Sequence, residues 1–158
     1  MLYLDFDGVL HHENCCWRPK TGPYLIAPAR YSMFQHAVLL QTMLAPYPAI
    51  KIVLSTSWVR VYSCYKAAKR LPPGLRSRVI GATYHSQMPG DSFFYMPRGE
   101  QVTADVQRRC PSSWLALDDD SSGWPDWALK HFLQTDPYEG ISPPELQDRI
   151  RDKLACLA

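Results

Sequence analysis

The sequence predicts an α/β fold in which helices cover both faces of a parallel sheet. Three short apolar runs, at residues 4–10, 51–57 and 114–120, have the composition of buried strands. Each run ends in acids or hydroxyls, and segments with helical spacing lie between the runs. Strands that alternate with helices favour a parallel sheet, whose strands end at one shared edge. Ligands bind at that edge, so these polar groups are the first candidates for a functional site.

The first half of the chain is expected to alternate strand, helix, strand and helix. A strand at residues 1–6 leads into a flap at 12–28 that contains Pro and Gly. Residues 30–45 carry apolar residues at helical spacing and predict a helix. A strand is expected at 50–56, and residues 58–70 are expected to form a helix that ends before a Pro-Pro-Gly breaker.

The second half of the chain continues the alternation. The expected elements are, in order, a strand at 79–83, a loop at 84–98, a helix at 99–110, a strand at 113–118, a loop after residue 120 and a strand at 131–134. The last helix is expected after Ser142, whose hydroxyl suits an N-cap before two prolines. Without a repeat or a linker, residues 1–158 are predicted to form a single domain.

The most specific stretch is Leu-Asp-Phe-Asp-Gly-Val-Leu at residues 4–10. Side chains at positions i and i+2 of a strand share a face, so Asp5 and Asp7 leave the first strand on one side, and Gly8 permits a sharp turn. Two carboxylates this close repel unless a cation, a proton or donors compensate, and oxygen ligands suit a divalent metal. A carboxylate can also be a nucleophile that forms an aspartyl-phosphate. The alternative is an ordinary Asp-Gly loop, which the polar ends of the other two runs disfavour.

These motifs together resemble the haloacid dehalogenase-like (HAD) phosphohydrolase superfamily. The resemblance rests on DFDGVL near the start, hydroxyls after the second run, a basic residue before the third and Asp-Asp at its end, and it covers most of the chain. The Ser-Thr-Ser-Trp stretch at 55–58 is similar to the small HAD domains of Swiss-Army-knife RNA-repair-like proteins. The resemblance implies a Rossmann-like HAD core and a magnesium-dependent phosphatase that works through an aspartyl-phosphate.

The resemblance also implies roles for individual residues. Asp5 matches the nucleophile, and Asp7 matches the general acid and base. An aspartate two residues after the nucleophile is typical of phosphatases and phosphotransferases, so dehalogenation is not expected. Thr56 is expected to hold a phosphoryl oxygen, with Ser55 and Ser57 as alternatives.

The implied Mg²⁺ would bind to Asp5, to the main-chain carbonyl of Asp7 and to Asp119, with Asp118 as the adjacent helper. Because three acids follow one another, the register stays open by one position, and Asp120 is an alternative ligand.

The cation that balances the nucleophile and the phosphoryl group is expected at Arg98, just before the helix that precedes the last motif strand. Four other arginines compete for this role: Arg76, Arg78, Arg108 and Arg109.

The intervals between the motifs leave no room for the full cap domain of larger HAD enzymes, because the core connections need most of their length. An open site suits a bulky phosphorylated substrate such as a nucleic-acid end or a phosphoprotein, unless a second subunit supplies a lid. The alternatives are a nucleotidase for small molecules and a non-catalytic binding or regulatory module. The oligomeric state is left open.

Composition adds weaker limits. With 158 residues of which 46% are hydrophobic, the chain can bury a core without disulfides, and its five cysteines include no CxxC pair. The net charge of +2 is too small to indicate nucleic-acid binding. No apolar run is long enough to span a membrane, and no signal peptide precedes the first strand, so no membrane association and a cytoplasmic location are expected.

Aromatic and histidine residues near the motifs leave two interpretations open. Trp58, Trp124 and Trp127 follow the hydroxyl and acidic motifs, where exposed rings could stack on bases. Packing of loops is the favoured interpretation for each. His11 and His12 follow the first motif, where they could assist protonation of the leaving group or contact phosphate. A structural or solvated role is the favoured interpretation, which leaves them outside the catalytic set.

Overall fold

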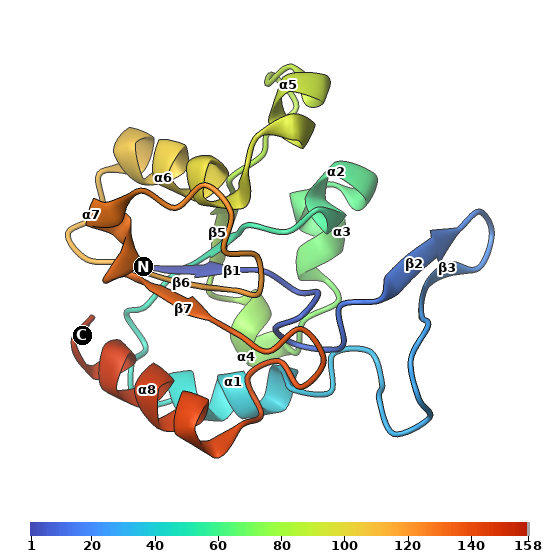
Figure 1. Cartoon of the computed structure of the whole chain (residues 1–158), viewed down its shortest axis with the longest axis horizontal. Coiled ribbons are helices and arrows are strands. Elements are labelled where there is room, and N and C mark those ends of the chain that lie inside the picture. Colours follow the sequence, from blue (N-terminus) through green and yellow to red (C-terminus); the bar gives the residue numbers. More distant parts are fainter. Residues whose placement is uncertain (158) are drawn as a thin grey trace.

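Five parallel strands form the central sheet in a computed structural model of the chain, which describes residues 1–157 (Figure 1). Their order is β5–β4–β1–β6–β7. The bounds are β1 (Leu2–Leu4), β4 (Ile52–Leu54), β5 (Val79–Ala82), β6 (Leu115–Asp118) and β7 (Phe132–Gln134). Leu4 is in register with Leu54 on one side and with Leu117 on the other. This is the predicted α/β Rossmann-like architecture, with β1 at its centre.

Helices cover both faces of the sheet because the side chains of β1 alternate between two cores. Leu2 and Leu4 belong to the larger core, and Tyr3 belongs to the smaller one. The larger core receives side chains from α1 (Ala37–Leu44), α3 (Cys64–Ala68), α4 (Pro73–Arg76) and α8 (Pro144–Ala155). The smaller core receives side chains from α6 (Arg98–Arg109) and α7 (Asp126–Leu129), which lie on the opposite side of the sheet from α1 and α8 (Figure 1).

The helix predicted at 30–45 is wrong in its first half, since α1 begins only at Ala37. Phe34 adopts a left-handed backbone with φ 57°, which no helix can continue through. Its ring contacts Phe6, with the ring centroids 5.2 Å apart. Packing against the first motif therefore overrides the helical pattern of this segment.

The helix predicted at 58–70 is two short helices, α2 (Trp58–Tyr62) and α3. Ser63 separates them with φ 79° and ψ 157°, and its N–H still donates to the carbonyl of Val59. A serine gives no warning of such a break, because its helix propensity is ordinary.

Four further segments differ from the sequence-based expectation. The flap at 12–28 contains a hairpin of β2 (Cys15–Arg18) and β3 (Gly22–Leu25), the loop at 84–98 contains α5 (Gly90–Tyr95), and the loop after residue 120 contains α7. Ser142 does not cap α8: Pro143 occupies the cap position, and no side chain caps the helix.

The hairpin and α5 are the two insertions that project from the body of the fold, and the hairpin lies beyond the end of β1 (Figure 1). Each is far smaller than a domain. Within residues 1–157, no helix has the length and apolarity that crossing a membrane requires.

Candidate active site

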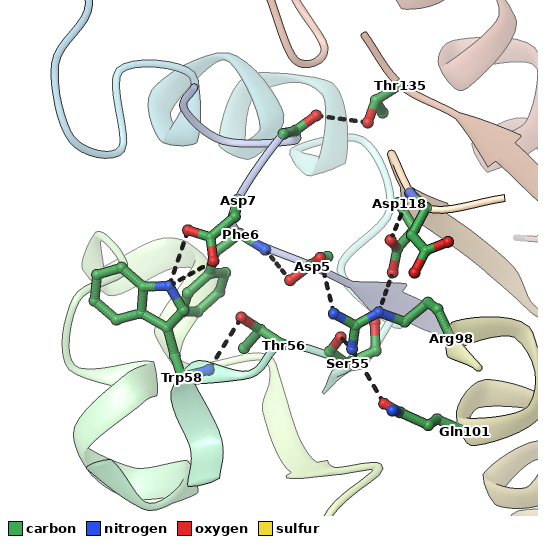
Figure 2. Close-up of polar contacts among 12 residues, drawn as sticks. Asp5, Phe6, Asp7, Ser55, Thr56, Trp58, Arg98, Gln101, Asp118 and Thr135 are labelled. Carbon is green, nitrogen blue, oxygen red and sulfur yellow. Dashed lines mark hydrogen bonds and ion pairs between the residues drawn. The ribbon is translucent and has the colours of Figure 1, made fainter. Parts of the chain in front are cut away.

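The motif residues meet because β1 lies between β4 and β6. Asp5 follows β1, Ser55 and Thr56 follow β4, and Asp118 is the last residue of β6. Parallel strands end at one edge of the sheet, so residues far apart in the sequence become neighbours. Figure 2 shows Asp5 at the centre of this group, with Thr56 on one side and Asp118 on the other.

Arg98, the first residue of α6, links the acids of two strands (Figure 2). Its Nη2 donates to Oδ2 of Asp5 over 3.2 Å, and its Nε lies 3.1 Å from Oδ2 of Asp118. Its Nη1 donates to the carbonyl of Ser55 and, over 3.2 Å, to Oε1 of Gln101. The guanidinium is thus held in a fixed orientation beside the predicted nucleophile.

The competing arginines are engaged elsewhere. Arg78 donates to main-chain carbonyls, including that of Tyr47 over 2.6 Å. Arg108 and Arg109 pair with the buried Asp105 in the same helix. Arg76 lies exposed at the end of α4. Of the five candidates, Arg98 is the one that contacts the motif acids.

Three carboxylates gather next to Arg98: one oxygen each of Asp5, Asp118 and Asp119 lies within 4.8 Å of the others. Gly8 makes room for Asp119, since a Cβ at position 8 would lie 2.3 Å from its Cγ. The backbone of Gly8 also has φ +66°, a conformation that L side chains rarely adopt. The carbonyl of Gly8 accepts a 2.6 Å hydrogen bond from Thr135 after β7 (Figure 2), which fixes the turn.

Burial and mutual repulsion favour the protonated forms of these acids. Burial raises the pKa of Asp5 to about 6, against the opposing effect of Arg98. Burial and the charge of Asp5 raise the pKa of Asp119 to about 7 and also raise the pKa of Asp118. One guanidinium does not balance three carboxylates, so the cluster suits a divalent cation that prefers oxygen ligands.

The carboxylate of Asp7 lies apart from this cluster and points toward Trp58 (Figure 2). It accepts from two donors that the sequence did not predict. The indole Nε1 of Trp58 donates to Oδ1 over 3.0 Å and to Oδ2 over 3.2 Å. Nε2 of His11 lies 3.0 Å from the same Oδ1. Cys15 also lies close, and burial with the charge of Asp7 raises the pKa of its thiol to about 12.

Residues 1–146 match the family model described as HAD domain in Swiss Army Knife RNA repair proteins. The chain belongs to this family. Comparisons with curated proteins and with solved structures gave no match. Membership indicates a phosphohydrolase type of function, and HAD domains generally use a divalent metal, for which the acidic cluster is the candidate site.

Within this HAD domain, the ligand assignment among the last acids stays a prediction, but the three side chains differ in their surroundings. Asp118 is fully buried, and its Oδ1 accepts from the N–H of Asp120 over 3.1 Å. Asp119 is half-buried in the cluster, whereas Asp120 is exposed and accepts from the N–H of Ser122. This arrangement favours Asp119 over Asp120 as a ligand.

The hydroxyl that would hold a phosphoryl oxygen also stays a prediction. Thr56 is buried, and its Oγ1 accepts from the N–H of Trp58 over 3.4 Å. The Oγ of Ser55 is buried without a hydrogen-bond partner among residues 1–157, and Ser57 is exposed. All three residues follow β4, at the edge of the sheet where Asp5 and Asp118 lie.

The three tryptophans near the motifs are packed rather than presented to solvent at the acids. Trp58 and Trp124 are buried, and Trp124 stacks on Phe132 with the ring centroids 4.2 Å apart. Trp127 is half exposed, but its ring packs against Trp114, which precedes β6. The packing interpretation therefore holds, and these rings give no support to base stacking.

Both histidines after the first motif are structural side chains, and His11 is the one that contacts a motif acid. It is fully buried against Asp7, and its four-residue spacing from Asp7 was the one signal in the sequence. His12 is buried as well and packs between Tyr31 and Tyr138. Neither histidine is solvated.

Proposed function

We propose that this protein is a magnesium-dependent phosphatase that acts through an aspartyl-phosphate on Asp5. The main support for this proposal is the position of the Asp5 carboxylate at the end of the central strand and the contacts that it makes there. Its Oδ1 accepts from the N–H of Phe6 over 2.7 Å, and its Oδ2 faces Arg98. The second acid of the motif, Asp7, lines the same hollow. A fixed nucleophile, a second carboxyl and a cation are what phosphoryl transfer requires.

In the first half-reaction, a carboxylate oxygen of Asp5 attacks phosphorus in line with the leaving oxygen. The bond from Asp5 to phosphorus forms as the bond to the leaving oxygen breaks. Protonated Asp7 gives its proton to that oxygen, so the product leaves as a neutral alcohol. Asp7 is then an anion, ready for the opposite role.

In the second half-reaction, Asp7 takes a proton from a water molecule as the water oxygen attacks phosphorus. The bond between phosphorus and Asp5 breaks, which releases inorganic phosphate and restores the Asp5 carboxylate. Asp7 ends protonated, as at the start of the cycle.

Charge on the transferring group is the main electrostatic problem of both steps. Arg98, which already contacts Asp5, would stabilise the phosphoryl oxygens, and Thr56 would donate a hydrogen bond to one of them. Asp5, Asp119 or Asp118, and the main-chain carbonyl of Asp7 would hold Mg²⁺, which when bound neutralises negative charge at the reacting group.

An open site supports a bulky substrate. The hollow that contains Asp5, Asp7 and Asp119 has a volume of about 560 Å³. The insertions beside it are a hairpin and one six-residue helix, neither of which forms a cap domain. Because the family is that of HAD domains in RNA repair proteins, this favours a nucleic-acid end or another large phosphomonoester as the substrate.

The test is turnover of p-nitrophenyl phosphate with and without Mg²⁺, followed by kcat/KM on a matched panel. The panel compares DNA and RNA oligonucleotides carrying a 3′- or 5′-phosphate with mononucleotides, sugar phosphates and phosphopeptides. We expect magnesium-dependent turnover with the highest kcat/KM on phosphorylated oligonucleotides. A preference for mononucleotides would instead indicate a small-molecule nucleotidase.

The intermediate has a test of its own. Rapid quench of Asp7→Asn with p-nitrophenyl phosphate, whose leaving group needs no proton, followed by intact-mass analysis should show one added phosphoryl group, because attack by water on the aspartyl-phosphate has lost its base. The added mass should be absent from Asp5→Asn. A protein that binds phosphate but turns over no substrate in the panel would be the non-catalytic module.

A further inference from the structure

Two N–H donors from different parts of the chain converge on one oxygen of Asp7. Trp58 is the first residue of α2, and His11 lies in the turn after the first motif. Both approach Oδ1 at 3.0 Å, whereas Oδ2 accepts the longer 3.2 Å hydrogen bond from the same indole, and the thiol of Cys15 lies close to the carboxylate. Oδ1 is therefore the anchored oxygen of this carboxylate.

The two donors are themselves immobilised. The indole of Trp58 packs edge-on against Phe6 and Phe34, with centroid separations of 5.8 and 5.3 Å, and its side chain is only 4% exposed. The N–H of Phe34 donates over 3.3 Å to Nδ1 of His11, which leaves the proton of a neutral imidazole on Nε2. Nε2 is the atom that faces Asp7.

We propose that Trp58 and His11 are positioning residues that anchor Oδ1 of Asp7, so that Oδ2 carries the proton exchanged with the leaving oxygen and then with water. This inference rests on the proposed phosphatase function. An indole N–H cannot accept a proton, so it orients the carboxyl without competing for the proton that moves. A freely rotating carboxyl would offer the proton in the right direction only part of the time.

The same contacts explain the unusual local backbone. The left-handed Phe34, which lies before α1, provides both the ring beside Trp58 and the N–H that orients His11. One backbone conformation at Phe34 thus serves both contacts, the packing of its ring against Trp58 and the hydrogen bond that orients His11.

Trp58→Phe separates positioning from packing, because phenylalanine keeps an aromatic ring in the core and removes the indole donor. Trp124→Phe is the matched control: Trp124 is also buried, and its indole donates to the carbonyl of Asp120 over 2.9 Å. The readout is kcat/KM, which reports steps up to formation of the aspartyl-phosphate and excludes its hydrolysis.

Two substrates make the readout specific for proton transfer. Benzyl phosphate releases an aliphatic alcohol that must be protonated, whereas p-nitrophenyl phosphate releases an anion that is stable without a proton. We expect Trp58→Phe to lower kcat/KM for benzyl phosphate on the order of 10–100-fold, and to change the value for p-nitrophenyl phosphate less than about threefold. Trp124→Phe should lower neither value selectively. Equal losses on both substrates after Trp58→Phe would overturn the proposal.

A double-mutant cycle tests whether Trp58 acts through Asp7. In an Asp7→Asn background, Trp58→Phe should cause no further loss on benzyl phosphate, and full additivity would contradict a shared role.

His11→Gln, which keeps an N–H donor, should retain more of kcat/KM than His11→Ala; equal losses would exclude His11 from the anchor. Wild-type protein that turns over neither these two substrates nor any substrate of the wider panel would overturn the phosphatase and the anchor together, whereas the outcomes above overturn the anchor alone.

Discussion

The smaller core side of the sheet holds two buried groups of acids that differ in how they are compensated. Asp105 in α6 accepts from the hydroxyl of Tyr3 over 3.0 Å and pairs with both Arg108 and Arg109. At the start of the same helix, Arg98 contacts Asp5 and Asp118, with Asp119 close by. One acid has three donors, and three acids share one guanidinium.

This difference distinguishes Asp105, an acid with a structural role, from the acids of the candidate active site around Arg98. The donors of Asp105 satisfy it within the fold, so it ties β1 to α6 and requires nothing from outside. The acids around Arg98 carry raised pKa values because burial and repulsion are only partly offset. Unbalanced charge that the fold tolerates at the end of the central strand marks a place where a cation and a phosphoryl group would bind.

The largest expected effect tests the catalytic side of this comparison. Asp5→Asn should reduce phosphatase turnover on the order of 1,000-fold or more, since an amide keeps the shape and loses the nucleophile. Asp105→Asn, measured on the folded fraction, should keep turnover within about threefold of wild type. The check is kcat on p-nitrophenyl phosphate, with circular dichroism to confirm folding. Asp5→Asn activity within tenfold of wild type would rule out Asp5 as the nucleophile.

Asp105→Asn, which should leave turnover nearly unchanged, should instead lower the stability of the fold. Asp105→Asn leaves Arg108 and Arg109 without their buried carboxylate and should lower the free energy of unfolding by about 2–3 kcal/mol. Asp148→Asn breaks an exposed pair with Arg151 and should change it by less than about 0.5 kcal/mol. Urea denaturation measures both. Similar values for the two variants would mean that the Asp105 network contributes little.

Magnesium affinity should depend on Asp119 more than on Asp120. Asp119→Ala removes a carboxylate from the cluster and should weaken binding in calorimetry at least about tenfold. Asp120→Ala removes an exposed side chain and should change affinity less than about threefold. Equal losses, or no binding by the wild type at millimolar Mg²⁺, would defeat this ligand assignment.

The smallest effect is the pH dependence of stability in the metal-free protein. The folded-state pKa values of Asp5 and Asp119, about 6 and about 7, lie above the ordinary aspartate value of 3.8. The folded state therefore holds more protons than the unfolded state between pH 4 and 7, so this cluster loses stability as pH rises through that window. Because Asp119 is half-exposed, solvent screening reduces its contribution to this loss of unfolding free energy to about 1 kcal/mol. Asp119→Asn should therefore flatten the plot of unfolding free energy against pH. An unchanged slope would contradict a raised pKa of Asp119 in the folded state.

The main parts of the site could be predicted because the ends of buried strands can be recognised in the sequence. Asp5, Thr56 and Asp118 follow apolar runs, and parallel strands place such residues at one edge. Arg98 was harder, because only tertiary contacts separate it from arginines such as Arg78.

The parts that sequence reasoning missed depend on backbone conformations without a local pattern. Nδ1 of His11 accepts from the N–H of the left-handed Phe34, and Trp58 begins a five-residue helix that ends before Ser63. The hairpin of β2 and β3 was missed as well, since its residues are half-buried or exposed and lack a clear alternation.

The central place of β1 has a consequence for biosynthesis. Its two neighbours, β4 and β6, come from residues 52–54 and 115–118, both later in the chain. During translation, β1 can pair with β4 early, but its other edge lacks a strand partner until β6 has been made. Sheets assembled from distant segments close slowly and expose apolar surface in the meantime. Asp5 can therefore meet Asp118 and Asp119 only after β6 has been made, so the acidic cluster of the site is assembled late.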